Sequence, residues 1–100
     1  PLQGTAGKDW DAVTFEIQPG GRAIVTIENY AKGGPYSTVT TIYELDGKQQ
    51  TATSSGELGK VTEIVLTPGP HTVMAQCHNR GADAVSCRIN VAGAVATHIN

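Results

Sequence analysis

The sequence predicts an all-β fold, a single antiparallel β-sandwich of about seven strands over residues 1–100. Turn signals recur at short intervals, and the segments between them are rich in Val, Ile, Thr and Tyr and alternate apolar with polar residues. No long run keeps apolar positions at helical spacing without Gly, Pro or β-branched residues interrupting it, so helix is expected to be nearly absent. Each sheet has one apolar face, and two such faces that cover each other make a sandwich.

Turn signals divide the chain into its expected strands. They are PGG at 19–21, KGGP at 32–35, DGK at 46–48, SSGELG at 54–59, TPGP at 67–70 and NRGAD at 79–83. Gly and Pro supply the backbone conformations that tight turns require, so these signals mark the strand ends.

The first two expected strands alternate with a period of two residues. Val13, Phe15 and Ile17 share one face of the first, and Ala23, Val25 and Ile27 share one face of the second. Successive side chains of a strand point to opposite sides of the sheet, so we expect both sets to face the core.

The segment 36–45 is rich in Thr and has apolar residues on both faces. Val39, Tyr43 and Leu45 share the odd-numbered face and Ile42 lies on the other, and we expect the odd face inside.

Two strands of different character follow. The dipeptide DG at 46–47 reverses the chain into KQQTATS at 48–54, which has little to bury and is expected at a sheet edge. KVTEIVL at 60–66 then returns to the core. The connections between these strands are expected to be either immunoglobulin-like or jelly-roll-like.

The only two cysteines, Cys77 and Cys87, lie in the last two expected strands. The inward-facing residues are Val73, Ala75 and Cys77 on one strand and Val85, Cys87, Ile89 and Val91 on the next. If the hairpin folds symmetrically about Ala82, Cys77 lies directly opposite Cys87 on a neighbouring antiparallel strand. A cross-strand disulfide is therefore geometrically available.

Other roles of the cysteines fit the spacing less well. A redox motif needs C-x-x-C and a structural zinc site needs four converging ligands, and neither spacing occurs. Two reduced, buried thiols stay an alternative. A disulfide closing this loop would stabilise the fold by roughly 2 to 3 kcal/mol. It would also indicate an oxidising compartment, so the protein is expected to be secreted, periplasmic or on the cell surface.

Charge and hydropathy exclude some classes of partner. The formal net charge is −2, and acids and bases are scattered singly. Nucleic-acid binding needs clustered Lys and Arg, so no nucleic acid is expected. VAGAVA at 91–96 is too short to span a bilayer, so no membrane span is expected. A chain starting at Pro1 without a charged and apolar leader fits a mature product after signal cleavage, or an expressed chain that has lost its initiator Met.

Two segments resemble known families. LTPGPHTVMAQCHNRGADAVSCRINV at 66–91 resembles the last two strands of bacterial immunoglobulin-like domains, and DWDAVTFEIQPGGRAIVTIEN at 9–29 resembles the opening of pre-peptidase C-terminal accessory domains of secreted bacterial proteases. Both resemblances imply a small extracellular β-sandwich used as a binding or accessory module. In some pre-peptidase C-terminal accessory domains, the aspartates of the Asp-x-Asp motif that opens this segment bind calcium, and Asp9 and Asp11 match them. No other cofactor is expected.

A candidate binding surface follows from an immunoglobulin-like order of strands. NYAKGGPY at 29–36 and HNRGAD at 78–83 would then lie at the same end of the sandwich. The candidate ligand-binding residues are Tyr30, Lys32, Tyr36, His78, Asn79 and Arg80. Tyr adds rigid amphipathic area and Arg adds directed donors, as in other loop-built recognition sites. In the alternative, the two tyrosines pack their rings on the end of the barrel.

Isolated aromatic and metal-binding side chains have structural explanations. Trp10 is expected to plug one end of the core, and stacking on a sugar ring is the alternative. His71 and His78 are an odd number of residues apart on one strand, so they face opposite ways and cannot share a metal ion, while His98 lies in the terminal segment. Met74 precedes Cys77, which is the wrong order for a blue-copper site. No metal site is expected.

No catalytic residues are expected. The sequence lacks G-x-S-x-G, H-E-x-x-H and P-loop motifs, and the acid pairs Asp9 with Asp11 and Glu44 with Asp46 are expected to face water. We therefore expect a non-catalytic, secreted or surface-exposed module that binds a protein or a glycan through loops at one end. The alternatives are an accessory domain that assembles through strand edges and an inhibitor that presents 30–36 to a protease.

Overall fold

The computed structural model describes residues 2–6, 10–32, 38–55, 58–80 and 84–99. These residues form strands and no helix, and no helix that could cross a membrane is found among them. The strands are β1 (Leu2–Ala6), β2 (Asp11–Ile17), β3 (Ala23–Lys32), β4 (Thr38–Leu45), β5 (Lys48–Ser55), β6 (Leu58–Val65), β7 (Gly69–Arg80), β8 (Ala84–Ala92) and β9 (Val95–Ile99).

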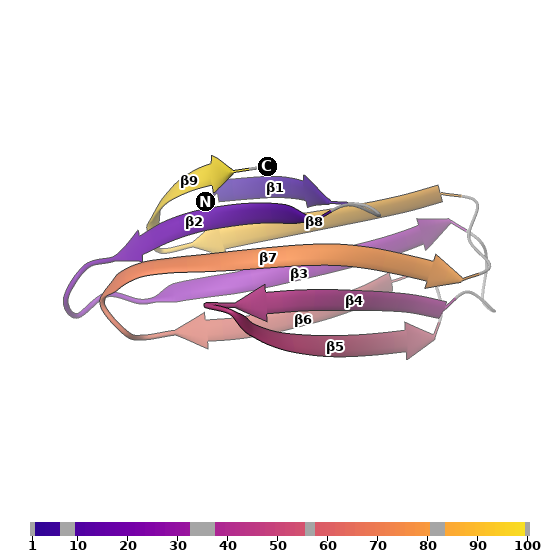
Figure 1. Ribbon diagram of the computed structural model, residues 1–100, viewed down its shortest axis with the longest axis horizontal. Helices are drawn as coiled ribbons and strands as arrows, with labels where there is room; N and C mark the ends of the chain where they lie inside the picture. Colours follow the sequence, from indigo (N-terminus) through magenta and orange to yellow (C-terminus); the bar gives the residue numbers. More distant parts are fainter. Residues whose placement is uncertain (1, 7–9, 33–37, 56–57, 81–83, 100) are drawn as a thin grey trace.

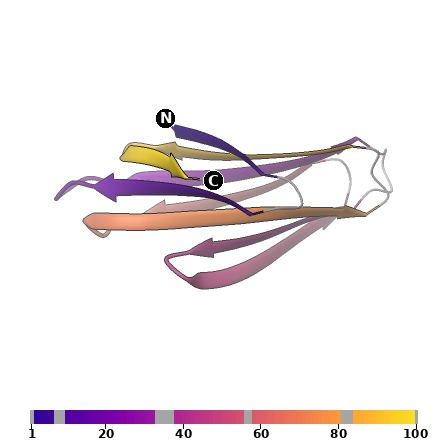
Figure 2. The ribbon, with the colours of Figure 1, turned by 45° about the horizontal axis from the view of Figure 1, so that its top comes forward.

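The strands make two antiparallel sheets that pack face to face (Figures 1 and 2). The four-stranded sheet has the order β1-β8-β3-β6, and the five-stranded sheet has the order β5-β4-β7-β2-β9. This confirms the predicted all-β sandwich. The seven expected strands correspond to β2–β8. β1 and β9 were not predicted, because these short terminal segments carry small and polar residues and little apolar alternation.

The order of strands is that of a jelly roll. β1 pairs with β8, β2 with β7, β3 with β6 and β4 with β5, so the chain is one long hairpin rolled into two sheets. In an immunoglobulin-like sandwich the first two strands share a sheet, whereas here β1 and β2 belong to different sheets. Of the two expected forms, the jelly roll is confirmed.

The centre of the long hairpin is the turn between β4 and β5. Asp46 and Gly47 have φ angles of 53° and 82°, and the flanking residues Leu45 and Lys48 pair with each other. Two consecutive residues with positive φ make the type I′ turn that matches strand twist, and Asp-Gly is a favoured sequence for it. The predicted DG reversal is confirmed, as is the edge position of β5.

The core lies between the sheets and consists of inward-facing residues of six strands. Its buried members are Val13, Phe15, Ile17, Ala23, Val25, Ile27, Tyr43, Val65, Val73, Ala75, Cys77, Cys87, Ile89 and Val91. All have the parity expected from their strands, and the odd face of β4 points inward as predicted. Burial of apolar area stabilises the sandwich by roughly 25 cal/mol per Å² removed from water.

The cysteines form a disulfide, but its placement differs from the expectation. Cys77 lies in β7 and Cys87 in β8, with a Cα–Cα separation of 6.2 Å. The two strands belong to different sheets, so the bridge crosses the core and does not join neighbouring paired strands. The predicted hairpin pairing about Ala82 is wrong, because β7 pairs with β4 and β2 while β8 pairs with β3 and β1. Both sulfurs point into one apolar layer, as predicted.

A polar contact accompanies the disulfide across the same layer. Asn29 is fully buried, and its Nδ2 donates to the Thr40 carbonyl oxygen at 3.1 Å and to Thr41 Oγ1 at 3.2 Å. Asn29 pairs in register with Cys87, and Thr41 with Cys77. We call Asn29, Thr41, Cys77 and Cys87 the inter-sheet bracket, since two residues from each sheet meet at one level of the sandwich.

A second polar contact joins the sheets nearer the opposite end. The Tyr43 hydroxyl of β4 donates to Glu63 Oε1 of β6 at 2.8 Å. Burial of the phenol, and secondarily its hydrogen bond to the Glu63 carboxylate, raise the pKa of Tyr43 to about 12. The phenol therefore stays protonated and able to donate throughout the physiological range.

The start of β2 differs from the sequence expectation in two ways. Asp11 is buried, with 1% of its surface exposed, and its Oδ1 accepts the Ala12 N–H at 3.0 Å. The expectation that it faces water is therefore wrong. Trp10 is half-buried and lies outside the core cluster, so the expectation of a core plug is wrong as well. The inward position of this segment belongs to Asp11, and the tryptophan takes the other side.

Candidate functional site

A pocket of about 300 Å³ lies on the outer face of the four-stranded sheet. Its lining residues are Glu28 and Tyr30 of β3, Leu58 of β6 and Arg88 of β8. Each is the outward member of an alternating strand whose inward neighbours fill the core. Cross-strand register brings them together, because Tyr30 pairs with Leu58 and Glu28 pairs with Arg88.

The apolar part of the pocket is unusually exposed. Tyr30 is 45% exposed and Leu58 is 53% exposed, although both are large side chains. Directly opposed residues on antiparallel strands have Cβ atoms only about 4.5 to 5.5 Å apart, so the two side chains form one contiguous apolar platform. A Tyr ring offers such a platform a flat, amphipathic surface.

The polar part of the pocket carries charges of both signs. Glu28 pairs in register with Arg88 on one side and with Lys60 on the other, so its carboxylate side chain stands between two cationic ones. The Arg88 guanidinium supplies N–H donors in a fixed fork, and the Glu28 carboxylate supplies acceptors. Vicinal hydroxyl groups, which both donate and accept, match this combination.

The loops predicted to form the site do come from one end of the sandwich. Lys32 at the end of β3 pairs with Ala84 at the start of β8, and Thr38 at the start of β4 pairs with Arg80 at the end of β7. These strand ends lie together at the right of Figure 1. The pocket is near the same end, because Tyr30 is two residues before Lys32.

The predicted site residues are divided among different surfaces. Tyr30 projects from the outer face of the four-stranded sheet, whereas His78 is exposed on the outer face of the five-stranded sheet. Lys32, Asn79 and Arg80 are strand-end residues whose backbones pair as described. Tyr36 lies outside the described residues.

Sequence reasoning missed three of the four pocket residues. Glu28, Leu58 and Arg88 come from strands that are far apart in the chain, and only the register of β3 with β6 and β8 brings them together. Their sequence signal was the outward parity of large or charged side chains in strands that alternate apolar and polar residues. That signal does not say which strands are neighbours.

A separate polar cluster at the opposite end surrounds His71. Its Nδ1 lies 2.6 Å from Asp46 Oδ2, its Nε2 lies 2.7 Å from the Thr67 carbonyl oxygen, and its ring stacks on Phe15 with centroids 5.4 Å apart. Both acceptors require an N–H, so the doubly protonated imidazolium fits the site best. The hydrogen bond to Asp46, followed by that to Thr67, raises the pKa of His71. The ring is buried and both nitrogens are engaged, so this cluster is a structural clasp.

No group of three or more His, Cys, Asp or Glu side chains able to hold a metal ion occurs in the described part of the chain. His71 is buried and His78 is exposed, so the two face opposite ways as predicted. Of the aspartates that suggested calcium, Asp11 is buried and Asp9 lies outside the described residues. Calcium binding by this pair stays a prediction.

Comparisons with known proteins identify similar folds. Neither a protein-family model nor a curated protein sequence matches the chain significantly. Among solved structures, CBM35 from Cellvibrio japonicus Abf62 is similar with a TM-score of 0.53 and 19% identity, over 95% of this chain and 73% of that one. A family two carbohydrate esterase from Clostridium thermocellum, solved in complex with cellohexaose, has a TM-score of 0.51 and 16% identity, over 98% of this chain and 28% of the esterase.

At these identities the likeness shows the fold alone. It agrees with the coarser expectation of a small β-sandwich module. The finer resemblances, to bacterial immunoglobulin-like and pre-peptidase C-terminal domains, are not confirmed, and the strand order departs from the immunoglobulin-like one.

Proposed function

We propose that residues 1–100 form one non-catalytic carbohydrate-binding module of a secreted or surface-exposed protein. Its glycan binds at the end of the sandwich where β3, β6 and β8 carry the pocket of Glu28, Tyr30, Leu58 and Arg88. The observation that carries the proposal is this pocket, in which an exposed aromatic ring lies beside a donor fork and a carboxylate.

Sugar recognition needs that combination. The C–H groups of a pyranose face pack on an aromatic ring, and the ring hydroxyls need directed donors and acceptors at its edge. Tyr30 and Leu58 supply the first surface, and Arg88 and Glu28 supply the second. The volume of about 300 Å³ is at the lower limit of small-molecule pockets, which suits the binding of a terminal sugar or a short oligosaccharide.

The similar structures support the glycan over a protein ligand. One is a CBM35, and another is a carbohydrate esterase that was solved with a bound oligosaccharide. Both contain this fold over nearly the whole of the present chain. Fold likeness alone does not transfer a ligand, so the pocket chemistry carries the argument.

The inter-sheet bracket supports rigid display of the ligand. Asn29 of the bracket immediately precedes Tyr30, and Cys87 immediately precedes Arg88. Two pocket residues are therefore next to positions fixed by a disulfide and by buried hydrogen bonds. A site held in its binding shape loses less conformational entropy on binding.

The same end of the molecule offers further contacts to a longer ligand. Strand β3 ends there at Lys32, and β7 ends there with Asn79 and Arg80. Tyr36 follows Lys32 in the chain by four residues. We include these four residues in the proposed surface as secondary contacts around Tyr30. His78 projects from the outer face of the five-stranded sheet and belongs to a different surface.

The disulfide supports the proposed compartment, and the position of His71 supports a non-catalytic role. The Cys77–Cys87 disulfide fits an oxidising environment outside the cytoplasm. Among the described titratable side chains, His71, whose pKa is raised by its hydrogen bond to Asp46, is buried in its clasp and away from the pocket, so it offers no general base to a bound substrate.

Binding of oligosaccharides by single variants tests the proposal. The change is Tyr30→Ala or Arg88→Ala, with Leu66→Ala as the control because Leu66 is 66% exposed and outside the pocket. We expect each pocket variant to weaken the oligosaccharide selected on a glycan array by about tenfold, because a stacked ring and a charged hydrogen bond are each lost. Calorimetric titration measures the affinity, and melting curves check the fold.

Two outcomes would contradict the proposed glycan site. If Tyr30→Ala and Arg88→Ala bind every glycan selected on the array as tightly as the parent chain does, the pocket is not the site. If the parent chain binds no glycan, the carbohydrate-binding function itself is wrong.

A second candidate function is assembly through a strand edge. β6 is the edge of the four-stranded sheet, and Ile64 on it and Leu66 after it are 60% and 66% exposed. An apolar sheet edge of this kind suits strand addition by a partner. Ile64→Lys would then abolish association with the partner, and Tyr30→Ala would leave it intact.

A further inference from the structure

The outer face of the five-stranded sheet is an open surface on the far side of the sandwich from the pocket. It is the face toward the viewer in Figure 1, and none of the described strands covers it. Its central strands are β7 and β4, whose alternate residues Val73, Ala75, Val39 and Tyr43 fill the core. The intervening residues therefore point outward.

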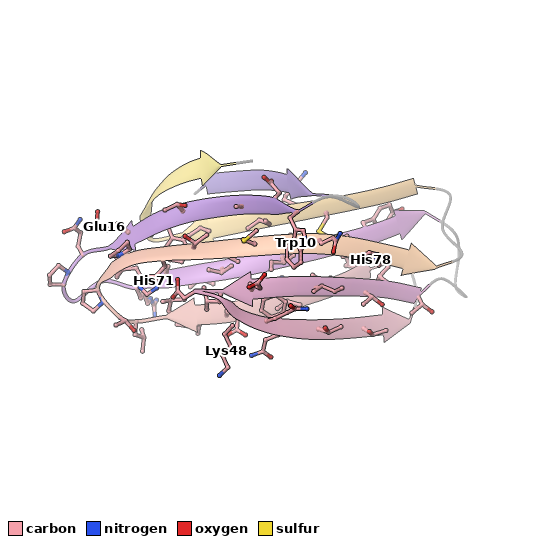
Figure 3. All side chains as sticks on the ribbon, viewed as in Figure 1. Trp10, Glu16, Lys48, His71 and His78 are labelled. Carbon is pink, nitrogen blue, oxygen red and sulfur yellow. A yellow bond between two sulfur atoms is a disulfide. The ribbon has the colours of Figure 1, made fainter. Side chains whose placement is uncertain are left out.

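Trp10 lies on this face. Figure 3 shows its side chain across β7, and the residue that follows, Asp11, occupies the inward position opposite Ala75. Trp10 is half-buried, so part of the residue is exposed to solvent. Ala12, the next outward residue of β2, has a small side chain.

The surroundings of Trp10 are polar but carry little charge. The outward residues of the neighbouring strand segments are Ala12, Thr14, Thr40, Ile42, Glu44, Thr72, Met74, Gln76 and His78. Glu44 is the one Asp, Glu, Lys or Arg side chain in that set. The pocket on the other sheet differs, because Glu28, Lys60 and Arg88 are adjacent there.

Cross-strand register places hydrogen-bonding groups in rows beside the ring. Gln76 pairs with Ile42, which pairs with Thr51 of β5. One step further along, His78 pairs with Thr40, whose Oγ1 lies 3.3 Å from Thr53 Oγ1. Amide, imidazole and hydroxyl groups therefore run across three strands next to an aromatic platform.

From this arrangement we propose a second glycan site, in which a neutral oligosaccharide lies across β2, β7 and β4 with one sugar stacked on Trp10. The site adds to the proposed function and uses none of the pocket residues. A neutral ligand fits the face because an anionic chain would find no Lys or Arg among those outward residues, and would meet Glu44. The indole supplies area for the C–H face of a pyranose, and the rows supply partners for its hydroxyls.

Two sites on opposite outer faces give the module two points of attachment. Tyr30 and Trp10 project from different sheets, so one sugar unit cannot contact both. A polysaccharide with many repeats can occupy both sites on one module or link neighbouring modules. Such linkage raises the apparent affinity above that of either site.

The fluorescence of Trp10 reports directly on the proposed site, because it is the only Trp in the chain. The experiment titrates the full chain with neutral oligosaccharides of glucose, mannose, xylose and galactose, and follows Trp emission and calorimetric heat together. We expect a saturable emission change that persists in Tyr30→Ala. We also expect Trp10→Ala to weaken the same oligosaccharide by about tenfold, with Trp10→Phe in between, because a benzene ring keeps part of the stack.

A second variant keeps the test decisive if Trp10→Ala folds poorly. His78→Ala retains the fluorophore and removes a solvent-exposed hydrogen-bonding group from the face. It is expected to weaken the emission-detected binding severalfold while melting as the parent does. Leu66→Ala again serves as the exposed control outside both sites.

The possible results separate the two proposals. Calorimetric binding that is weakened in Trp10→Ala, together with an emission change that is weakened in His78→Ala and kept in Tyr30→Ala, supports the second site. Glycan binding that is abolished by Tyr30→Ala and unaffected by Trp10→Ala and His78→Ala overturns the second site and leaves the pocket standing. Glycan binding that is weakened by Trp10→Ala and unaffected by Tyr30→Ala supports the second site and overturns the pocket. A chain that binds no glycan overturns both sites.

Discussion

At the scale of single residues, the His71 clasp is where the fold depends most directly on pH. The imidazolium form donates to both Asp46 and Thr67, whereas a neutral ring that donates from Nε2 would present a lone pair to the Asp46 carboxylate. The clasp also ties two connections to a strand, since Asp46 is in the β4–β5 turn, Thr67 lies between β6 and β7, and His71 lies near the start of β7. Protonation of one ring therefore affects a whole end of the sandwich.

The sign of the pH dependence follows from the raised pKa of His71. A group whose pKa is higher in the folded state contributes its full stabilisation below the unfolded pKa, near 6.5, and loses it as pH rises through the folded value. We expect the free energy of unfolding to fall as pH increases from about 6 through the neutral range. Denaturant titrations at several pH values measure this slope.

Asp46→Asn is the matched control for that slope. Asn tolerates the positive φ of 53° at this position and can still accept the Thr72 N–H that Asp46 Oδ1 now accepts at 2.9 Å. Its amide nitrogen can donate to a neutral His71, so the preference for the imidazolium disappears. We expect the variant to be less stable by about 1 to 2 kcal/mol at pH 6, and the difference to shrink at higher pH. Parallel curves for the two chains would show that His71 does not control the slope.

At the scale of elements, the turn at Gly93 between β8 and β9 is the most sterically restricted of the glycine-containing turns that the structure describes. Gly93 has a φ of 85°, and a Cβ there would lie 2.6 Å from the Arg22 carbonyl oxygen. Gly20, between β2 and β3, has a φ of 79° but has nothing within 4 Å of such a Cβ. The two glycines share a left-handed backbone conformation, but only Gly20 has room for a Cβ atom.

This difference predicts unequal effects of the same substitution. Gly20→Ala should cost about 1 kcal/mol, because only the left-handed conformation penalises it. Gly93→Ala should cost roughly 2 to 4 kcal/mol, because the backbone of the neighbouring turn must also move. Thermal melting of the two variants compares the costs, and equal shifts would mean that the β8–β9 turn yields easily.

Element by element, the sequence predicted strands well wherever apolar residues alternate. Every inward residue expected from β2 and β3 is buried, and the DG turn is of the expected kind. Trp10 and Asp11 were assigned to the wrong sides because hydrophobicity alone suggests burying the indole and exposing the acid. The actual parity of β2, which starts at Asp11, decides against both.

At the scale of the whole molecule, the disulfide is expected to contribute a large share of the stability. It closes a segment with a sequence separation of 10 that passes from one sheet to the other. Replacing both cysteines by Ala should lower the free energy of unfolding by about 3 kcal/mol, which corresponds to a drop in Tm of more than about 10 °C. Denaturation with and without a thiol reductant makes the same comparison on the parent chain. A Tm unchanged by reduction would show that hydrophobic packing of the thiols is sufficient.

The arrangement of whole strands was harder to predict than the strands themselves. Sequence parity correctly aimed Cys77 and Cys87 at one apolar layer, but it could not say whether that layer joins neighbours in a sheet or opposite sheets. The assumption that consecutive strands pair predicted a disulfide between neighbours in one sheet. In the jelly roll, the disulfide joins opposite sheets. The pocket was missed for the same reason, because Tyr30, Leu58 and Arg88 meet only through long-range register.

The nested pairing of the strands also orders the entropic cost of assembly. Two residues join β4 to β5, whereas β1 reaches β8 by pairing Leu2 with Val91. The entropic cost of closing a loop grows with the length of chain enclosed, so contacts near the Asp46–Gly47 turn have the lowest cost. Each outer strand pair then closes a shorter effective loop once the inner pairs have formed. Strand pairing in this chain should therefore begin at the β4–β5 hairpin and extend outward to the more distant pairs. The terminal strands β1 and β9 should be the last to dock and the first to fray.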